Sequence, residues 1–123
     1  MERVLIVDDS STMRKIITRS LRQAGFEIGE ILEAENGQAG LERLAGVSVG
    51  IILTDINMPV MDGLTFIENI RANVAWNGMP IIVITTEGSE GLVKEAIKSG
   101  ANNLIKKPFT PEQVKEKLAP YFA

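Results

Sequence analysis

Short, uninterrupted apolar runs constrain the fold of this chain more than any other feature of its sequence. Ile51, Ile52 and Leu53 form one run, and Val4–Val7 and Pro80–Ile84 hold two more. Apolar residues at consecutive positions indicate a strand that is buried on both faces, whereas a half-exposed strand alternates apolar with polar residues. The runs therefore predict a parallel sheet that helices cover on both sides.

Two further strands and five helical patterns complete an alternating series. The expected strands are residues 4–7, 30–34, 51–53, 80–84 and 103–106. The expected helices are residues 13–24, the segment from the Asn36-Gly37 turn to Gly46, residues 64–72, residues 89–99 and the segment after Thr110. Thr110-Pro111-Glu112-Gln113 is a capping box with proline at the first helical position. This alternation favours an α/β fold with right-handed crossovers, and it leaves the strand order open.

Length and composition indicate one globular domain, which we expect to span residues 1–123. Domains of about 100 to 150 residues are common, and no linker divides this chain. Hydrophobic residues make up 45% and charged residues 24%, which is ordinary for a globular protein. The apolar runs are far shorter than the roughly 20 residues of a membrane-spanning helix, and no signal peptide is evident. We therefore expect a cytoplasmic protein without membrane insertion.

Missing residue types exclude several kinds of chemistry. The chain has no cysteine and no histidine, which excludes disulfides, zinc sites of the usual kind, thiol catalysis and imidazole acid-base catalysis. With 13 Lys and Arg against 16 Asp and Glu, the formal charge of −3 argues against nucleic acid as a partner. Chemistry must therefore rest on carboxylates, lysines and hydroxyls.

Acidic, hydroxyl and basic residues stand where the predicted strands end. Asp8 and Asp9 follow the first strand and Asp55 the third, while Thr85 and Lys107 follow the fourth and the fifth. Parallel strands all point the same way, and ligands of open α/β sheets bind outside the carboxyl ends of the strands. We therefore expect these five residues to converge at one edge of the sheet.

Three carboxylates at one edge need compensating positive charge. A lysine ammonium and a hard divalent cation supply it, and oxygen ligands open to solvent suit Mg²⁺. A carboxylate beside Mg²⁺ can attack a phosphoryl group and form an acyl phosphate. Asp55 is the leading candidate for this nucleophile, although a strand-end aspartate can also be an ordinary solvated loop residue.

The first predicted helix carries a basic face. It begins after Ser10-Ser11-Thr12, whose side chains are suited to cap its N terminus. The positions that its apolar stripe leaves free are occupied by Arg14, Lys15, Arg19 and Arg22. We expect these residues to form a solvated face, and a docking surface for a kinase or another partner is the functional alternative.

Taken together, the motifs resemble those of response-regulator receiver domains. The chain has paired acids after the first strand, DxNMPxMDG after the third, Thr after the fourth and KPF after the fifth. The resemblance spans the whole chain and is greatest to stand-alone chemotaxis regulators of the CheY kind. It implies a flavodoxin-like, doubly wound fold with the strand order 2-1-3-4-5, of which CheY is a standard example.

The resemblance implies a Mg²⁺ site around the phosphoacceptor. It makes Asp55 the residue that accepts the phosphoryl group. Asp9 and Asp55 are expected to bind Mg²⁺ through their side chains, Asn57 through its backbone carbonyl and Asp8 largely through water.

The resemblance also assigns the groups that act on the phosphoryl group. Thr85 and Lys107 are expected to hold it, and the Lys107-Pro108 peptide bond is expected to be cis. Asn57 and Glu87 match positions that tune the lifetime of the acyl phosphate by crowding or ordering the attacking water.

By the same resemblance, a histidine kinase is the expected phosphodonor and the expected output is a surface that another protein reads. The flagellar motor switch is the expected target, a phosphatase is a further expected partner, and we expect a monomer. The residues of the expected switch and output face are Thr85, Val93, Ile97, Leu104, Lys106, Val114 and Lys117. The family usually carries Tyr or Phe where this chain has Leu104, so we expect the loop 86–88 to transmit most of the change.

Three other functions are weighed against this one. A haloacid-dehalogenase-like phosphatase also uses an aspartate nucleophile beside Mg²⁺, but the second acid of its DxD motif would be Asn57, which cannot shuttle a proton. A nucleotide or flavin binder is disfavoured because no GxGxxG or GxxxxGK[ST] follows the first strand. Within the receiver family, a phosphate sink or a non-flagellar adaptor is the alternative role.

Overall fold

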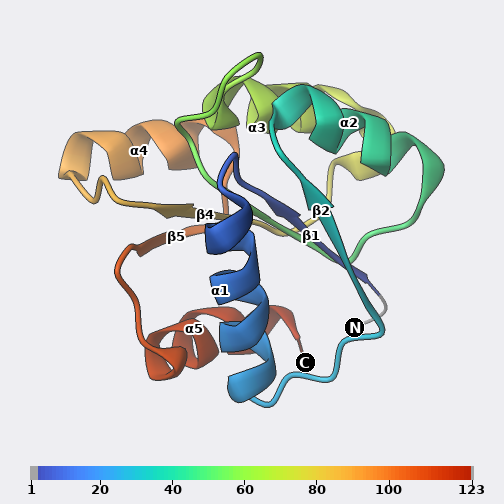
Figure 1. The fold of residues 1–123 in the computed structure, drawn as a ribbon. Coiled ribbons are helices and arrows are strands. Elements are labelled where there is room, and N and C mark those ends of the chain that lie inside the picture. The colour runs from blue at the N-terminus through green and yellow to red at the C-terminus, as the bar shows by residue number, and fades with distance from the viewer. Residues whose placement is uncertain (1–2, 123) are drawn as a thin grey trace.

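The computed structural model of the protein describes residues 3–122 and contains every predicted strand and helix (Figure 1). The strands are β1 (Arg3–Val7), β2 (Glu30–Ala34), β3 (Ile51–Thr54), β4 (Ile81–Thr85) and β5 (Asn103–Lys106). The helices are α1 (Ser11–Gln23), α2 (Gly37–Gly46), α3 (Gly63–Ala72), α4 (Glu90–Ser99) and α5 (Pro111–Leu118). Residues 1, 2 and 123 of the expected domain lie outside the described residues.

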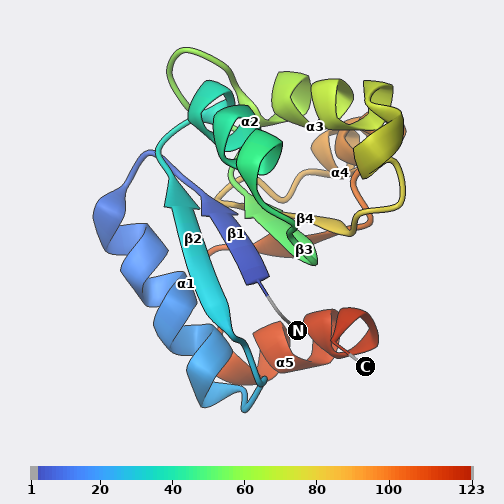
Figure 2. The same ribbon diagram turned by 90° about the vertical axis from the view of Figure 1, so that its right-hand side faces the viewer.

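The sheet has the strand order β2-β1-β3-β4-β5, and all neighbouring strands are parallel. This confirms the α/β class and the flavodoxin-like order. Helices α1 and α5 cover one face of the sheet, and α2, α3 and α4 cover the other (Figures 1 and 2). The order places β1 beside β3, so the two strands that lead into Asp8 and Asp55 are direct neighbours.

Alternate residues of the strands fill two cores, one on each face of the sheet. In β1, Leu5 and Val7 lie in the core under α2, α3 and α4, whereas Val4 and Ile6 face α1 and α5. All four side chains are 0% exposed. Burying an aliphatic side chain of this size contributes about 1.5 to 3 kcal/mol, so both faces of each strand must be apolar.

The helices are short and begin at side-chain caps. The longest, α1, has 13 residues and its N-cap is Ser10, whose side chain accepts from the Met13 N–H. The predicted capping box from Thr110 to Gln113 is present at the start of α5. Within residues 3–122, no helix has the length and the apolar character that crossing a membrane would need.

Several element bounds differ by one or two residues from those that the sequence predicts. The fourth strand spans Ile81–Thr85 instead of residues 80–84, because Pro80 has no N–H to donate while Thr85 still pairs with Lys106. Residues Val74–Trp76, which lie between the predicted third helix and fourth strand, form a 3₁₀ turn, and Trp76 packs against the core under α2, α3 and α4.

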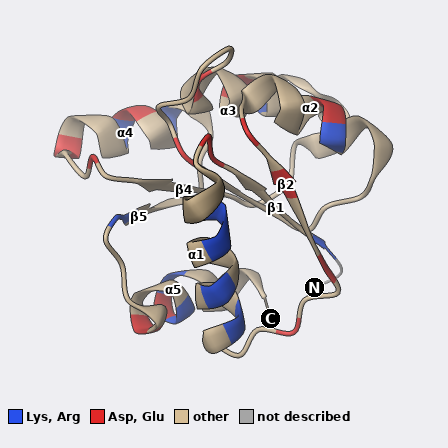
Figure 3. Cartoon of the chain, in the orientation of Figure 1, with Lys and Arg blue, Asp and Glu red and all other residues tan. Residues whose placement is uncertain are grey.

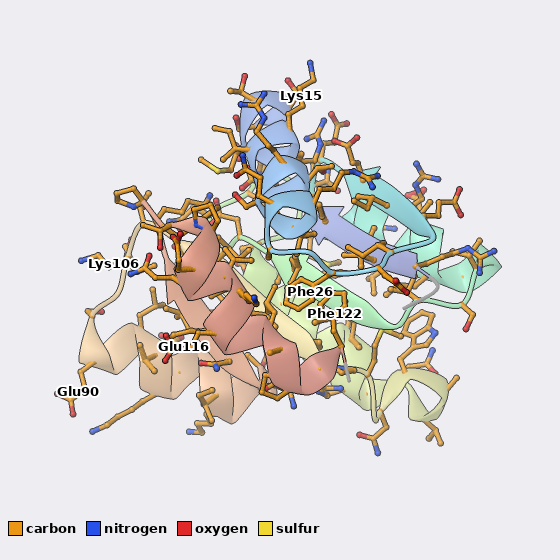
Figure 4. The ribbon with its side chains drawn as sticks, turned by 90° about the horizontal axis from the view of Figure 1, so that it is seen from below. Lys15, Phe26, Glu90, Lys106, Glu116 and Phe122 are labelled. Carbon is orange, nitrogen blue, oxygen red and sulfur yellow. The ribbon has the colours of Figure 1, made fainter. Side chains whose placement is uncertain are left out.

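An aromatic contact joins the segments that follow α1 and α5. It lies at the end of the sheet opposite to the carboxyl ends of the strands. Phe26 follows α1 and Phe122 follows α5, and their rings stack with centroids 4.2 Å apart (Figure 4). Stacked aromatic pairs of this kind add about 0.5 to 1.5 kcal/mol beyond the burial of their area. The contact therefore stabilises the packing of α1 beside α5. It does not involve the end of the sheet where Asp8 and Asp55 lie.

Gly63 begins α3 directly against the backbone of Asp55. Its N–H donates to the Ile56 carbonyl at 2.8 Å, and a Cβ at this position would overlap the Asp55 carbonyl oxygen. The described glycines with a positive φ are Gly25 and Gly100. Close approach of the backbone, rather than a left-handed turn, therefore requires glycine at position 63.

We predict that Gly63→Ala lowers stability by roughly 1 to 3 kcal/mol, because the added methyl group must push α3 away from β3. Gly91→Ala is the matched control: it lies in the first turn of α4, where a Cβ meets nothing within 4 Å. The control should gain up to about 1 kcal/mol, since alanine favours helix more than glycine does. Urea unfolding measures both variants, and equal stabilities would contradict the prediction.

Candidate functional site

The carboxyl ends of β1, β3 and β5 bring four charged side chains together. One carboxylate oxygen from each of Asp8, Asp9 and Asp55 lies within 4.8 Å of the others. Lys107, which follows β5, forms ion pairs with two of these carboxylates. The parallel sheet thus joins residues that lie up to 99 positions apart in the sequence.

Lys107 bridges the acids from two different strands. Its Nζ donates to Asp8 Oδ2 at 2.9 Å and to Asp55 Oδ2 at 3.1 Å, and its side chain is only 7% exposed. Burial by itself lowers the pKa of the ammonium, but the hydrogen bonds and charges of the two carboxylates outweigh burial and raise this pKa above its ordinary value. Lys107 is therefore charged at neutral pH. The peptide bond between Lys107 and Pro108 is cis, as predicted.

The three carboxylates have different surroundings. Asp8 is 1% exposed, and its other oxygen, Oδ1, accepts from the Ser10 N–H at 2.9 Å. Asp55 is half-buried, and its Oδ1 accepts from the Ile56 N–H at 2.7 Å. Asp9 is exposed, and within residues 3–122 no donor reaches its carboxylate. Asp9 therefore forms the open side of the cluster, and Asp55 is the more accessible of the two acids that Lys107 contacts.

Thr85 ends β4 next to Lys107. Thr85 is 1% exposed, and its Oγ1 accepts from the Glu87 N–H at 3.3 Å. Its carbonyl accepts from the Lys107 N–H at 2.7 Å, which ties the ends of β4 and β5 together. Glu87 and Asn57 are exposed in the loops that follow the carboxyl ends of β4 and β3.

The loop after β3 holds a strained turn. The Met61 N–H donates to the Pro59 carbonyl at 2.7 Å, and Val60 between them has a φ of 68°. A positive φ costs a residue other than glycine about 1 to 3 kcal/mol. The Met61 carbonyl also accepts from the Gly37 N–H at 3.1 Å, so the start of α2 anchors this side of the rim.

The donor set fits Mg²⁺. The cluster offers only oxygen atoms, and Mg²⁺ is usually held by one or two carboxylates with several waters completing its shell. Asp9 supplies an exposed carboxylate and Asp55 a partly exposed one, whereas Asp8 is 1% exposed. A cation here would balance the carboxylate charge that Lys107 alone leaves uncompensated.

Only some residues of the expected output face are exposed to solvent. The members that reach solvent are Val93, Ile97, Lys106 and Lys117. Val114 is 2% exposed, because it lies four residues before Leu118 on the stripe that packs α5 against the sheet. In this structure Val114 is therefore not accessible to a partner. Leu104 is also buried, in the core on the side of α4, at 7% exposure.

The types of residue in the sequence did not predict which backbone groups contact the site. The N–H groups of Ser10 and Ile56 each hold one carboxylate oxygen, and the position of Gly63 against Asp55 decides how closely α3 approaches. The capping pattern from Ser10 and the loop motif around Gly63 marked these segments. They did not indicate which atoms would meet.

Residues 4–119 match the family described as "Response regulator receiver domain". The chain belongs to this family. The match confirms the family resemblance drawn from the motifs at the strand ends. Receiver domains of this type are signalling proteins rather than enzymes that turn over a separate substrate.

Two relatives with chemotaxis names cover most of this receiver domain. It is 48% identical over 117 residues to "Chemotaxis protein CheY1" of Helicobacter pylori, across 94% of this chain and 93% of the relative. It is 46% identical to "Chemotaxis protein CheY homolog" of Campylobacter jejuni, across 94% of this chain and 88% of the relative. The chain is therefore a receiver domain of the CheY type, consistent with two-component signalling and chemotaxis.

Solved structures agree with this receiver fold. The chemotaxis response regulator CheY4 of Vibrio cholerae matches with a TM-score of 0.87 at 33% identity, over 98% of both chains. A CheX-CheY-BeF3-Mg²⁺ complex from Borrelia burgdorferi matches with a TM-score of 0.86 at 32% identity, over 98% of this chain and 89% of that one.

We predict that Lys107→Met destabilises the metal-free protein by roughly 2 to 4 kcal/mol, because it leaves the buried Asp8 carboxylate unpaired. Mg²⁺ should restore part of this loss by supplying positive charge to the cluster. Because the pKa of Lys107 is raised, its stabilisation is complete below the unfolded-state value of about 10.4 and is lost as pH rises through the folded-state value.

Urea unfolding at pH 7, with EDTA and with Mg²⁺, measures this effect. Lys106→Met is the matched control, since Lys106 is the neighbouring lysine and is exposed. Similar losses in the two variants would show that the bridge to Asp8 and Asp55 contributes little.

Proposed function

We propose that this receiver domain accepts a phosphoryl group on Asp55 from the phosphohistidine of a histidine kinase, in a step that requires Mg²⁺. One observation carries this proposal: Lys107 bridges Asp8 and Asp55 while the Asp9 carboxylate beside them lacks a protein donor within residues 3–122. A cluster with this charge distribution has a place for one further cation next to an accessible carboxylate.

Asp55 is the proposed nucleophile because of its surroundings. Asp8 is 1% exposed and therefore nearly inaccessible, and Asp9 makes no contact with Lys107. Asp55 combines partial exposure with the Lys107 contact. One of its oxygens would bond to phosphorus while the bond from phosphorus to the donor histidine nitrogen breaks, with that electron pair staying on nitrogen.

The neighbouring residues would then hold the phosphoryl group. The Lys107 ammonium, now 3.1 Å from Asp55 Oδ2, would pair with one phosphoryl oxygen, and the Thr85 hydroxyl would donate to another. Asn57 and Glu87 are exposed beside this position, where each would crowd or order the water that hydrolyses the acyl phosphate.

We propose that Asp9 and Asp55 hold Mg²⁺ through their side chains, Asn57 through its backbone carbonyl and Asp8 through water. The ion would supply positive charge to the carboxylates and to the transferring group. The Borrelia relative was solved with Mg²⁺ and the fluoride BeF3, which supports a Mg²⁺ site in this chain.

The output would be a protein-binding surface formed by α4, β5 and α5, read by the flagellar motor switch in chemotaxis. The chemotaxis names of the Helicobacter and Campylobacter relatives support this role. The complex of the Borrelia relative with CheX supports a further partner, for which we propose a phosphatase. We propose that residues 1–123 act as a single monomeric unit in the cytoplasm. A phosphate sink or non-flagellar adaptor is the second candidate role, favoured by Leu104 in place of an aromatic switch.

The contact between Gly88 and Lys106 offers a route for the switch that bypasses Leu104. A Cβ at Gly88 would lie 2.7 Å from Lys106 Cδ, so the loop after β4 rests on the lysine stem. Lys106 lies at the side of the molecule, beside the segment that leads into α4 (Figure 4). Drawing Thr85 toward a phosphoryl group would move residues 86–88 and therefore displace Lys106 on the proposed output surface.

We predict that Asp55 alone accepts phosphate from acetyl phosphate or a kinase, and only with Mg²⁺ present. Intact-mass measurement should detect one phosphoryl adduct in the wild type and none in Asp55→Asn. Asp9→Asn should weaken Mg²⁺ binding without moving the adduct to another residue, because Asp9 is proposed as a metal ligand only. An adduct in Asp55→Asn at the wild-type level would refute the assignment.

We predict that beryllofluoride with Mg²⁺ shifts amide resonances most at residues 55–57 and 85–91, and less at Leu104. Leucine lacks a polar tip that could favour one of two environments, so its rotamers differ little in energy. Leu104→Ala should therefore leave partner affinity dependent on phosphorylation, although it should cost about 2 to 5 kcal/mol of stability. Complete loss of that dependence in a folded Leu104→Ala variant would identify Leu104 as a switch residue.

A further inference from the structure

Arg14 departs from the solvated face predicted for the basic residues of α1. Its side chain is 16% exposed, and its Nε donates to Glu33 Oε1 on β2 at 2.7 Å. Its Nη1 donates to the backbone carbonyl of Asp8 at 2.6 Å. The guanidinium therefore joins α1, β2 and the end of β1 in one contact.

The other basic residues of α1 lie differently. Lys15, Arg19 and Arg22 are exposed and, with Glu33 of β2, line a groove beside α1. The basic positions of α1 are blue in Figure 3. Arg14 is the basic residue of α1 that turns toward the acidic cluster. Its contacts are directional, since Nε and Nη1 belong to one planar group with fixed donor angles.

The Asp8 carbonyl controls the orientation of the peptide unit between Asp8 and Asp9. The peptide unit that contains it also contains the N–H of Asp9, so holding this oxygen fixes the plane that joins the two acids. On the other side of Asp8, its N–H donates to the Ala34 carbonyl at 3.0 Å. Both peptide units that flank Asp8 are therefore tied to β2, one directly to Ala34 and one through Arg14 and Glu33.

We infer that Arg14 is a positioning residue for the cation site. Glu33 anchors the guanidinium, and the guanidinium fixes the Asp8–Asp9 peptide so that the open Asp9 carboxylate faces Asp55. The inference rests on the proposed function, because it assigns Arg14 a role toward the Mg²⁺ that Asp9 and Asp55 are proposed to bind.

Positioning and simple electrostatics predict opposite results for Arg14→Ala. Removing a positive charge near three carboxylates would strengthen their attraction for a cation. Releasing the Asp8–Asp9 peptide would weaken binding, because the carboxylates would no longer be held in converging positions. Partners that orient metal ligands commonly affect metal affinity about 10- to 100-fold. We expect Arg14→Ala to raise the Mg²⁺ dissociation constant about tenfold.

Isothermal titration of the full chain with MgCl₂ tests the inference. Arg19→Ala removes a cation from the exposed side of the same helix and should leave the dissociation constant unchanged or slightly lower. Arg3→Ala is a second control, since the Arg3–Glu30 ion pair at 3.0 Å also joins β1 to β2 but lies at the far end of these strands. It should change stability without changing Mg²⁺ affinity.

Glu33→Gln tests the anchor while Arg14 stays in place. It should weaken Mg²⁺ binding less than Arg14→Ala does, and the double variant should bind no more weakly than Arg14→Ala. Arg14→Lys should recover only part of the affinity, because one ammonium cannot reproduce the two fixed donors. In metal-free protein, the amide resonances of Asp9 and Ser10 should move in Arg14→Ala and Glu33→Gln but not in Arg19→Ala.

Mg²⁺ binding by Arg14→Ala that is as tight as, or tighter than, that of the wild type would overturn the inference and leave the proposed function intact. A wild-type chain that binds no Mg²⁺ would overturn both. If Arg14→Ala does not fold, Glu33→Gln decides: unchanged affinity and unchanged Asp9 resonance in that variant would overturn the inference.

Discussion

The buried Lys107 ammonium between Asp8 and Asp55 is the interaction on which the rest of the site depends. Two carboxylates this close repel each other unless a cation lies between them. Lys107 neutralises Asp8 inside the protein and shares its charge with Asp55, while Asp9 receives none of it. Negative charge on the open side of the site is therefore not balanced by Lys107. This is the side where a metal ion and a phosphoryl group would bind.

The parallel sheet makes this bridge possible. Strand β4 lies between β3 and β5, so a residue that follows β5 must reach past the end of β4 to meet acids on β3 and β1. The long lysine stem spans that distance, and the Lys107 N–H bond to the Thr85 carbonyl holds its backbone at the β4 end. Thr85 itself ends β4, the strand between β3 and β5.

The loops at the two ends of the strands differ in how many contacts fix them. At the edge remote from the site, Arg71 donates to the Gly100 carbonyl at 2.9 Å and to the Asn77 carbonyl at 2.7 Å, which joins the segments after α3 and α4. At the site, residues 86–89 of the loop after β4 are exposed, and Gly88 lies against the Lys106 stem. Conformational change is therefore expected at the edge where the phosphoryl group would bind.

The sequence by itself determined the order of strands and helices along the chain and the residues at the strand ends. Both are local properties, since burial on two faces requires consecutive apolar residues and helix starts require capping side chains. The same motifs, through the family that they resemble, identified Asp9, Asp55 and Lys107 as site residues and implied the strand order.

Only the tertiary structure decided which groups meet. It turned Arg14 from the expected solvated face toward the Asp8 carbonyl, placed Val114 in the core and set Gly63 against the Asp55 backbone. A pattern of residue types records spacing and burial within one segment. It does not record contacts between a side chain and the backbone of another segment, because these depend on how the strands and helices pack in three dimensions.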